Sequence, residues 1–245
     1  MDYFVKKQGK TLLGITCSDG NAFIADVVKN VLIVQAICGS SYPVYIGNDS
    51  SIAGETLKDY FFGKDGLGET QQHFLEKLKI NESLVQKKKA YKFIAESALK
   101  HKGEIAFITI GPVTNLALAY HYDNRIADCF TNLALMGTSD TFAGLHSFYT
   151  AEFNIGLDPE AAYVIFQKFK NILVCSLDTT IFDIPSQEPE CLFLSDKTAK
   201  ADFVRKVHVY QYKKPLTPQV CDPLAVLVLF KPDVVKSGIN LKIDI

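Results

Sequence analysis

The sequence has almost no excess of charge of either sign. Its 26 lysine and arginine residues are balanced by 27 aspartate and glutamate residues, which gives a net charge of -1 at pH 7. Proteins that bind nucleic acid through a basic face carry a positive excess, so no nucleic-acid partner is expected. The sequence also lacks an uninterrupted apolar run of about 18 residues, so no membrane-spanning helix is predicted.

Several compact catalytic and binding motifs are missing as well. There is no G-x-G-x-x-G after the first apolar run and no G-x-x-x-x-G-K-[ST], which argues against a nucleotide-binding module. No G-x-S-x-G marks a serine nucleophile. The cysteines are widely spread without a C-x-x-C pair, and the histidines lack metal-ligand spacing. Dispersed cysteines of this kind favour a reducing compartment, so a cytoplasmic location is expected.

Short β-like runs alternate with longer helical patterns along the chain. Strands are predicted at 11–17, 43–47, 104–111, 133–137 and 171–180, and helices at 21–39, 69–79, 82–101, 112–122, 158–169, 195–213 and 222–230. This alternation predicts an α/β fold with a Rossmann-like, mainly parallel sheet and helices on both faces. In such sheets ligands bind at the carboxyl ends of the strands, so a site is expected in the loops that follow them.

The stretch "QVCDPLAVLVLF", residues 219–230, places one acid ahead of an apolar run. Asp222 is a candidate helix cap, because its oxygen accepts a bond from an unpaired backbone N–H. Pro223 would then begin the helix, where its missing N–H costs nothing. Alternatively, Asp222 faces a site and holds a ligand there. This stretch alone leaves both interpretations open.

Two other segments also have a structural and a functional interpretation. In "GPVTNLALA" (111–119), glycine and proline are typical of a turn between strand and helix. Alternatively, the backbone carbonyl of Ile110, at the end of the preceding strand, coordinates a hard cation. In "AEFNIGLDPEAA" (151–162), Glu152 and Asn154 alternate with apolar neighbours. That pattern predicts either a half-exposed strand or a polar face that binds sugar hydroxyls.

Smaller signals follow the first two predicted strands. In "SDGNA" (18–22), Asn21 is either a helix cap or an amide that reaches a ligand. In "FFGKDGLG" (61–68), the glycines predict a turn, while Phe62 could also stack on a flat heterocycle. Both segments lie where a site is expected in this fold.

Together these segments resemble the inosine-uridine-preferring nucleoside hydrolase family. The matching pieces, in family order and at similar spacing between Thr11 and Val235, are "LLGITCSDGNA", "PVYIG", "GKDGLG", "GPVTNLALA", "LMG", "AEFNIGLDPEAA" and "CDPLAV". Family members are calcium-dependent enzymes that cleave the N-glycosidic bond of ribonucleosides and release free base and ribose. The resemblance therefore implies a nucleoside substrate, Ca2+ as cofactor, and a homo-oligomer, either a dimer or a tetramer.

The resemblance also implies a role for individual residues. Asp222 would bind calcium and the ribose 2′- and 3′-hydroxyls, and the carbonyl of Ile110 would be a second metal ligand. The expected contacts to the ribose and the pocket come from Asn21, Glu152, Asn154 and Met136. The chemistry is coherent, because calcium takes roughly six to eight oxygen ligands, a metal-bound water is a usable nucleophile, and nearby oxygens stabilise an oxocarbenium-like state.

Three positions depart from the family pattern. Cys221 stands where members often have a histidine, and a neutral thiol is a poor general acid compared with imidazole. Phe62 also replaces a histidine, and its ring can stack on a base but cannot donate a proton. His146 lies about where a ribose-contacting asparagine is expected, and is either a substitute polar group or a loop histidine.

The first part of the family pattern has no counterpart in residues 1–245. Members open with a strand and a D-x-D-x-x-x-D-D cluster that supplies the catalytic base and most calcium ligands, whereas "MDYFVKKQGKT" resembles the tail of the helix that follows. We therefore expect one nucleoside hydrolase-like domain that lacks this strand. A signal peptide on a longer amino end would make the protein secreted instead of cytoplasmic. The competing hypothesis is a truncated or degenerate homologue that binds ribosides or partner subunits without catalysis.

Overall fold

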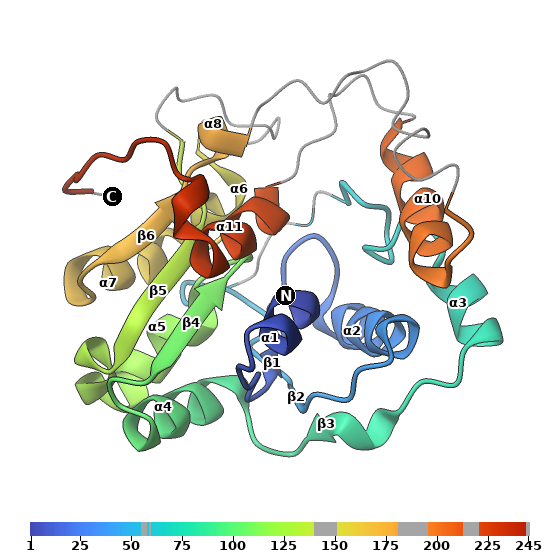
Figure 1. The fold of residues 1–245 in the computed structure, drawn as a ribbon. Helices are drawn as coiled ribbons and strands as arrows, with labels where there is room; N and C mark the ends of the chain where they lie inside the picture. The colour runs from blue at the N-terminus through green and yellow to red at the C-terminus, as the bar shows by residue number, and fades with distance from the viewer. Residues whose placement is uncertain (55–57, 59, 140–150, 181–195, 213–220, 244–245) are drawn as a thin grey trace.

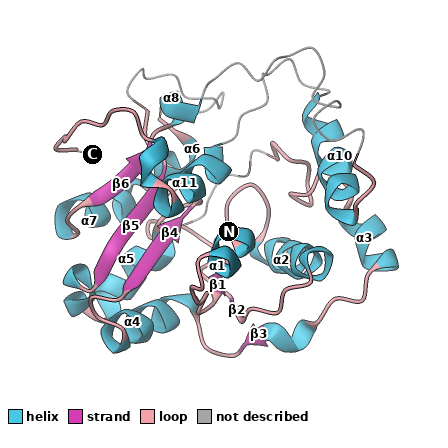
Figure 2. Cartoon of the chain, in the orientation of Figure 1, coloured by secondary structure: helices cyan, strands magenta, loops and turns pink. Residues whose placement is uncertain are grey.

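The computed structural model describes residues 1–54, 58, 60–139, 151–180, 196–212 and 221–243, and the side chains of 208–212 are outside that description. The strands form two parallel sheets of three strands each (Figures 1 and 2). The first, in the order β1-β2-β3, contains β1 (Ile15–Thr16), β2 (Val44–Tyr45) and β3 (Val85–Gln86). The second, in the order β4-β5-β6, contains β4 (Ile105–Thr109), β5 (Phe130–Met136) and β6 (Ile172–Cys175). The predicted α/β fold with parallel strands is confirmed.

Helices pack around both sheets. They are α1 (Asp2–Lys7), α2 (Ile24–Cys38), α3 (Gln71–Lys77), α4 (Ala90–Lys100), α5 (Thr114–Tyr122), α6 (Phe153–Gly156), α7 (Pro159–Lys168), α8 (Leu177–Thr180), α10 (Ala199–Tyr212) and α11 (Cys221–Phe230), with short 3-10 turns at Glu82–Leu84, Asn124–Asp128 and Pro232–Val234.

The second sheet is covered on both faces. Side chains alternate along β5, so Leu133 and Leu135 join the core formed with α4, α5 and α7, while Met136 packs with Ala225 of α11 on the other face. Burying a leucine side chain contributes roughly 2 kcal/mol, so β5, with Leu133 through Met136 buried, anchors this half of the molecule. Figure 1 shows α11 beside the ends of β4 and β5.

The first sheet is covered by α2. Val27 and Val31, spaced by one helical turn, pack with Val44 of β2 and with Leu32 of the same helix. The helix ends at Gly39, whose φ of 63° is the left-handed conformation that glycine adopts without strain. Beyond α2, α3 and α10 lie side by side in Figure 1.

No strand described in the structure pairs with the free edges of β1 and β4, so other contacts join the two sheets. Asn115, in the first turn of α5, donates through Nδ2 to the carbonyl of Cys17 at 2.8 Å and accepts through Oδ1 from the N–H of Asn48 at 3.1 Å. The amide therefore links the chain beyond β1 to the chain beyond β2. Gly47 leaves room for it, because a Cβ there would lie 2.4 Å from Asn115 Nδ2.

Asp158 forms the second part of this junction. It caps α7 by accepting from the N–H of Ala161 at 3.0 Å. It also accepts from the N–H of Ile52 at 3.0 Å and from the hydroxyl of Thr114. Asp158 is 0% exposed, so one buried carboxylate joins α5, α7 and the loop after β2.

Two predicted elements differ at their boundaries. The strand predicted at 11–17 is reduced to two residues, Ile15 and Thr16, which pair with Val44 and Tyr45 of β2 in the register observed. The helix predicted at 82–101 begins only at Ala90. Asn81 caps a 3-10 turn before it through the N–H of Ser83, and β3 follows.

Two predicted strand segments contain helical turns. The strand predicted at 171–180 ends at Cys175, and α8 follows. Thr180 donates to the carbonyl of Leu177 at 2.6 Å, a local bond that favours turns over strands. The segment at 151–156 is α6 rather than a half-exposed strand, because Glu152 caps a helical turn there.

Replacing Asp158 with alanine is expected to destabilise the fold. The hydroxyl of Thr114 and the N–H groups of Ile52 and Ala161 would lose their acceptor in a site that water does not reach. Because each unsatisfied buried group costs about 1–3 kcal/mol, we expect a loss of roughly 2–5 kcal/mol in the free energy of unfolding in urea. Asp233→Ala, at an exposed position, is the matched control. Equal unfolding free energies for the two variants would contradict this role.

Candidate active site

Five of the predicted site residues come together at the carboxyl end of β5. Met136 is the last residue of β5, and Asn154 donates through Nδ2 to its carbonyl at 3.1 Å and to its Sδ at 3.2 Å. Glu152 caps α6 directly before Asn154. Cys221 and Asp222 open α11, which packs against β5 and β6. The sequence places these residues on three separate segments, and the fold joins them.

Glu152 is held by three backbone N–H groups. Its carboxylate accepts from Asn154 at 3.0 Å, from Ile155 at 3.1 Å and from Thr138 at 3.2 Å. The residue is only 4% exposed, and charge-assisted bonds of this kind are strong. A Cβ on Gly137 would lie 3.2 Å from Glu152 Oε2 and 2.9 Å from Leu135 Cδ2. Glu152 therefore fixes the chain at residue 138 beside the start of α6.

Asp222 lies inside the first turn of α11, which begins at Cys221. Asp222 is therefore a helical residue and not the N-cap, so the predicted cap is wrong. A negative charge in the first turn still interacts favourably with the helix dipole. Burial, followed by repulsion from Glu152, raises the pKa of Asp222 from 3.8 to about 7. The two carboxylates therefore create a negative site, which favours a cation or a developing positive charge.

Cys221 is surrounded by groups that keep its thiol protonated. Burial is the main cause of its raised pKa, and the neighbouring charges of Asp222 and Glu152 act in the same direction. Its Sγ lies 3.1 Å from the hydroxyl of Thr180, and this contact acts in the opposite direction on the pKa without outweighing burial. A thiol with a raised pKa releases its proton less readily than a free one, so Cys221 is a weak proton donor.

Three other predicted residues follow strands elsewhere. Asn21 lies between β1 and α2, and because the N-cap of α2 is Phe23, the cap interpretation of Asn21 is wrong. Phe62 lies in the glycine-rich turn, edge-on to Phe61 with ring centroids 4.9 Å apart. Ile110 directly follows β4. The ligand roles of these residues stay predictions, and His146 lies outside the described residues.

The glycine-rich turn at 61–68 is confirmed, and Asp65 organises it. The carboxylate of Asp65 accepts from the N–H groups of Leu67 at 2.7 Å, Glu69 at 2.9 Å and Gln71 at 2.9 Å. Gly66 has a φ of 67°, which favours glycine. The turn is therefore a rigid element that carries Phe62.

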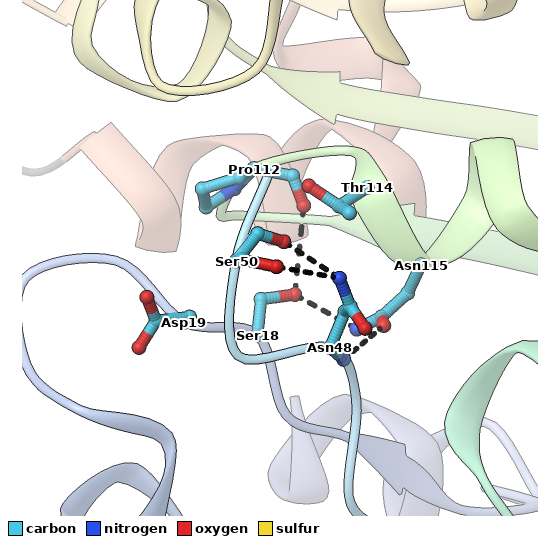
Figure 3. Close-up of a pocket in the computed structure, with 7 residues that line it drawn as sticks. All are labelled: Ser18, Asp19, Asn48, Ser50, Pro112, Thr114 and Asn115. Carbon is cyan, nitrogen blue, oxygen red and sulfur yellow. Dashed lines mark hydrogen bonds between the residues drawn. The ribbon is translucent and has the colours of Figure 1, made fainter. Parts of the chain in front are cut away.

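A polar pocket lies where β1, β2 and β4 end (Figure 3). Its lining residues are Ser18, Asp19, Asn48, Ser50, Pro112, Thr114 and Asn115. The space between them is too narrow for a water molecule, so it is a packed polar junction rather than a nucleoside pocket. Figure 3 shows Asp19 turned away from the Ser18–Asn115 cluster. The sequence signal for this junction is "GPVTN", a segment that predicts a turn or, alternatively, a cation ligand at the preceding carbonyl of Ile110.

Within the described part of the chain, no three histidine, cysteine, aspartate or glutamate side chains lie close enough to hold a metal ion. A backbone carbonyl such as that of Ile110 is not among these groups, so the metal-ligand roles of Asp222 and Ile110 stay predictions. None of the helices in the same part of the chain is long and apolar enough to cross a membrane.

Comparison with known proteins supports the resemblance seen in the sequence. The family model described as inosine-uridine preferring nucleoside hydrolase matches residues 3–245. Uridine nucleosidase 1 of Arabidopsis thaliana is 31% identical over 173 residues, which cover 69% of this chain and 49% of the relative. The inosine-uridine preferring nucleoside hydrolase of Crithidia fasciculata is 30% identical over 175 residues, covering 69% and 52%. The chain thus spans about half the length of these relatives.

Solved structures share the fold. A purine-preferring ribonucleoside hydrolase from Gardnerella vaginalis has a TM-score of 0.77 at 24% identity, covering 99% of this chain and 81% of that one. An inosine-guanosine nucleoside hydrolase has a TM-score of 0.80 at 21% identity, covering 93% and 73%. At these identities the likeness concerns the fold alone.

The raised pKa of Asp222 predicts a pH-dependent stability in buffer with a metal chelator. The folded protein binds this proton more tightly than the unfolded chain, so the free energy of unfolding falls as the pH rises between about 4 and 7. Asp222→Asn removes this contribution, and its slope over that range should be flatter. Urea unfolding at several pH values measures both slopes. Asp233→Asn, at an exposed position, is the control, and parallel curves for wild type and Asp222→Asn would contradict the prediction.

Proposed function

The chain belongs to the inosine-uridine preferring nucleoside hydrolase family, and we propose that it hydrolyses the N-glycosidic bond of a ribonucleoside to free base and ribose. The observation that carries this proposal is the pair of carboxylates at the end of β5, Asp222 and Glu152, where burial and then repulsion from Glu152 raise the pKa of Asp222. The activities of the relatives, whose length the chain covers only in part, agree with it.

The negative site suits the transition state of this reaction. As the bond to the base breaks, the base takes the electron pair and positive charge develops on the ribose ring. Fixed negative groups stabilise such charge most effectively where water is excluded. Glu152 is held rigidly by its three N–H donors, so it needs no reorganisation as the charge develops.

Water must lose a proton when it adds to the anomeric carbon. A group whose pKa lies near the working pH exchanges protons most effectively, and Asp222 has a pKa of about 7. Asp222 is therefore the described residue best suited to accept this proton. Asn154 and Asn21 would hold ribose hydroxyls, as the family resemblance implies.

The leaving base is expected to receive little help from position 221. The thiol of Cys221 has a raised pKa, and Phe62 has no proton to donate. A substrate whose leaving group departs without protonation should therefore react faster than a natural nucleoside.

Calcium dependence stays a proposal. Calcium takes roughly six to eight oxygen ligands, and the described residues hold no group of three acidic, histidine or cysteine side chains suited to a metal. Backbone carbonyls and water also serve as calcium ligands, so the carbonyl of Ile110 and the negative charge around Asp222 support the proposal. Assembly as a homo-oligomer and a cytoplasmic location likewise stay predictions.

A second candidate function is a non-catalytic homologue that binds ribosides or partner subunits. The incomplete set of metal-binding side chains among the described residues favours it. It predicts the same ribose contacts without turnover.

Substitution at Cys221 should test its role as an acid. We expect Cys221→Ser to change the hydrolysis of inosine by less than about threefold, because a thiol with a raised pKa contributes little general-acid catalysis. Wild type and variant should both cleave p-nitrophenyl riboside faster than inosine, as measured by absorbance. A loss of about a hundredfold or more for inosine alone would show that Cys221 protonates the base.

Ribose release from inosine or uridine by the 245-residue chain separates the two candidate functions. A reducing-sugar assay with calcium, without calcium and with chelator is the measurement. If the chain is an enzyme, it should release ribose, and Asp222→Asn should lower the rate of this release by about a hundredfold or more. Nucleoside binding by calorimetry without release would support the non-catalytic homologue.

A further inference from the structure

A buried ion pair joins the loop after β1 to the loop after β2. Lys58, between β2 and α3, donates to Asp19, between β1 and α2. The two side chains are only 7% and 4% exposed, so both charges are largely removed from water. Lysine and aspartate are rarely buried to this extent unless they are paired. The pair therefore fixes where these loops meet.

Lys58 also contacts the chain on the other side of Asn21. Its ammonium lies 5.4 Å from the ring centroid of Phe23, within the range of cation–π attraction. Asp19 precedes Asn21 by two residues and Phe23 follows it by two. One ammonium group therefore holds both ends of the turn at residues 19–23, which we call the Asn21 turn.

The glycine-rich turn fastens the same two loops at a second point. Gly66 lies against Ala22, because a Cβ on Gly66 would be 2.7 Å from the Cβ of Ala22. Asn30 of α2 donates through Nδ2 to the carbonyl of Asp65 at 2.8 Å. Contacts at residues 58 and 66 thus enclose the Asn21 turn, and Lys58 supplies the contact that depends on charge.

We propose that Lys58 is a positioning residue that holds the Asn21 turn in one conformation and so presents the Asn21 amide to the substrate. Desolvation offsets much of the attraction within a buried ion pair, so the pair adds little stability for its own sake. Its effect is geometric, because a buried ammonium must keep its acceptor and its aromatic contact. The part concerning substrate rests on the proposed function, whereas the positioning of the turn does not.

Amide hydrogen exchange of the full chain, measured by mass spectrometry, tests the positioning. Lys58→Met removes the ammonium but keeps an unbranched side chain. We expect a peptide that covers residues 18–24 to exchange about tenfold faster in this variant, because the turn opens locally more often. Lys58→Arg keeps the charge and should restore most of the protection.

Lys29→Met is the matched control. Lys29 on α2 forms an ion pair with Asp26 at 3.2 Å, but its side chain is 47% exposed, so its loss should leave exchange in residues 18–24 unchanged. Equal exchange in Lys58→Met and Lys29→Met would overturn the proposal.

Amine acylation of the wild-type protein provides a measurement that needs no variant. Buried Lys58 should react at least about tenfold more slowly than Lys64, which is exposed. Asp19→Asn should remove most of this protection. Equal reaction of Lys58 and Lys64 in wild type would overturn the ion pair, and with it the proposal, even if Lys58→Met does not fold.

Kinetics with inosine separate the positioning role from the proposed function. We expect Lys58→Met to raise KM about fivefold or more with a smaller change in kcat, because the lost contact concerns ribose binding. Faster exchange with an unchanged KM would overturn the link between the turn and the substrate. A wild-type chain that neither binds nor cleaves inosine would defeat the proposed function, while the exchange rates would still decide whether Lys58 positions the turn.

Discussion

The molecule depends on a buried polar junction that joins two separate parallel sheets. No described strand connects β1 to β4, so Asn115 and Asp158 make the connection instead. Asn115 bonds the chain at Cys17 and Asn48, and Asp158 bonds Ile52 together with α5 and α7. Buried polar groups are costly unless their partners are in place. The geometry of the loops above the sheets is therefore fixed by directional bonds rather than by apolar packing alone.

The candidate site uses the same kind of constraint at the end of β5. Glu152 is fully engaged by backbone N–H groups, and Asn154 is turned towards Met136. The α11 helix then buries Asp222 near Glu152, and burial followed by repulsion from Glu152 raises the pKa of Asp222 to about 7. Two like charges in a poorly solvated site lower the stability of the empty protein. They are useful only if a positive group, either an ion or a transition state, compensates them.

The loop after β2 extends the polar junction to the chain between β1 and α2. It is held by Asn115 and Asp158 near its start, and Lys58 and Gly66 then fasten it against the chain between β1 and α2. The first three of these contacts each use a polar group that is buried or nearly so. A loop fixed in this way can hold Asn21 and Phe62 in place without belonging to a strand or helix.

The sequence by itself determined the α/β alternation and the glycine-rich turn, because these features depend on neighbouring residues. It also placed the polar residues at strand ends and carried the family resemblance. Only the tertiary structure showed that Glu152 also binds the N–H of Thr138, that Asp222 lies near Glu152, and that Lys58 pairs with Asp19. The physical reason is distance along the chain. An ion pair across 39 residues, or a pKa raised by a carboxylate on another segment, has no local pattern and arises only when folding brings the groups together.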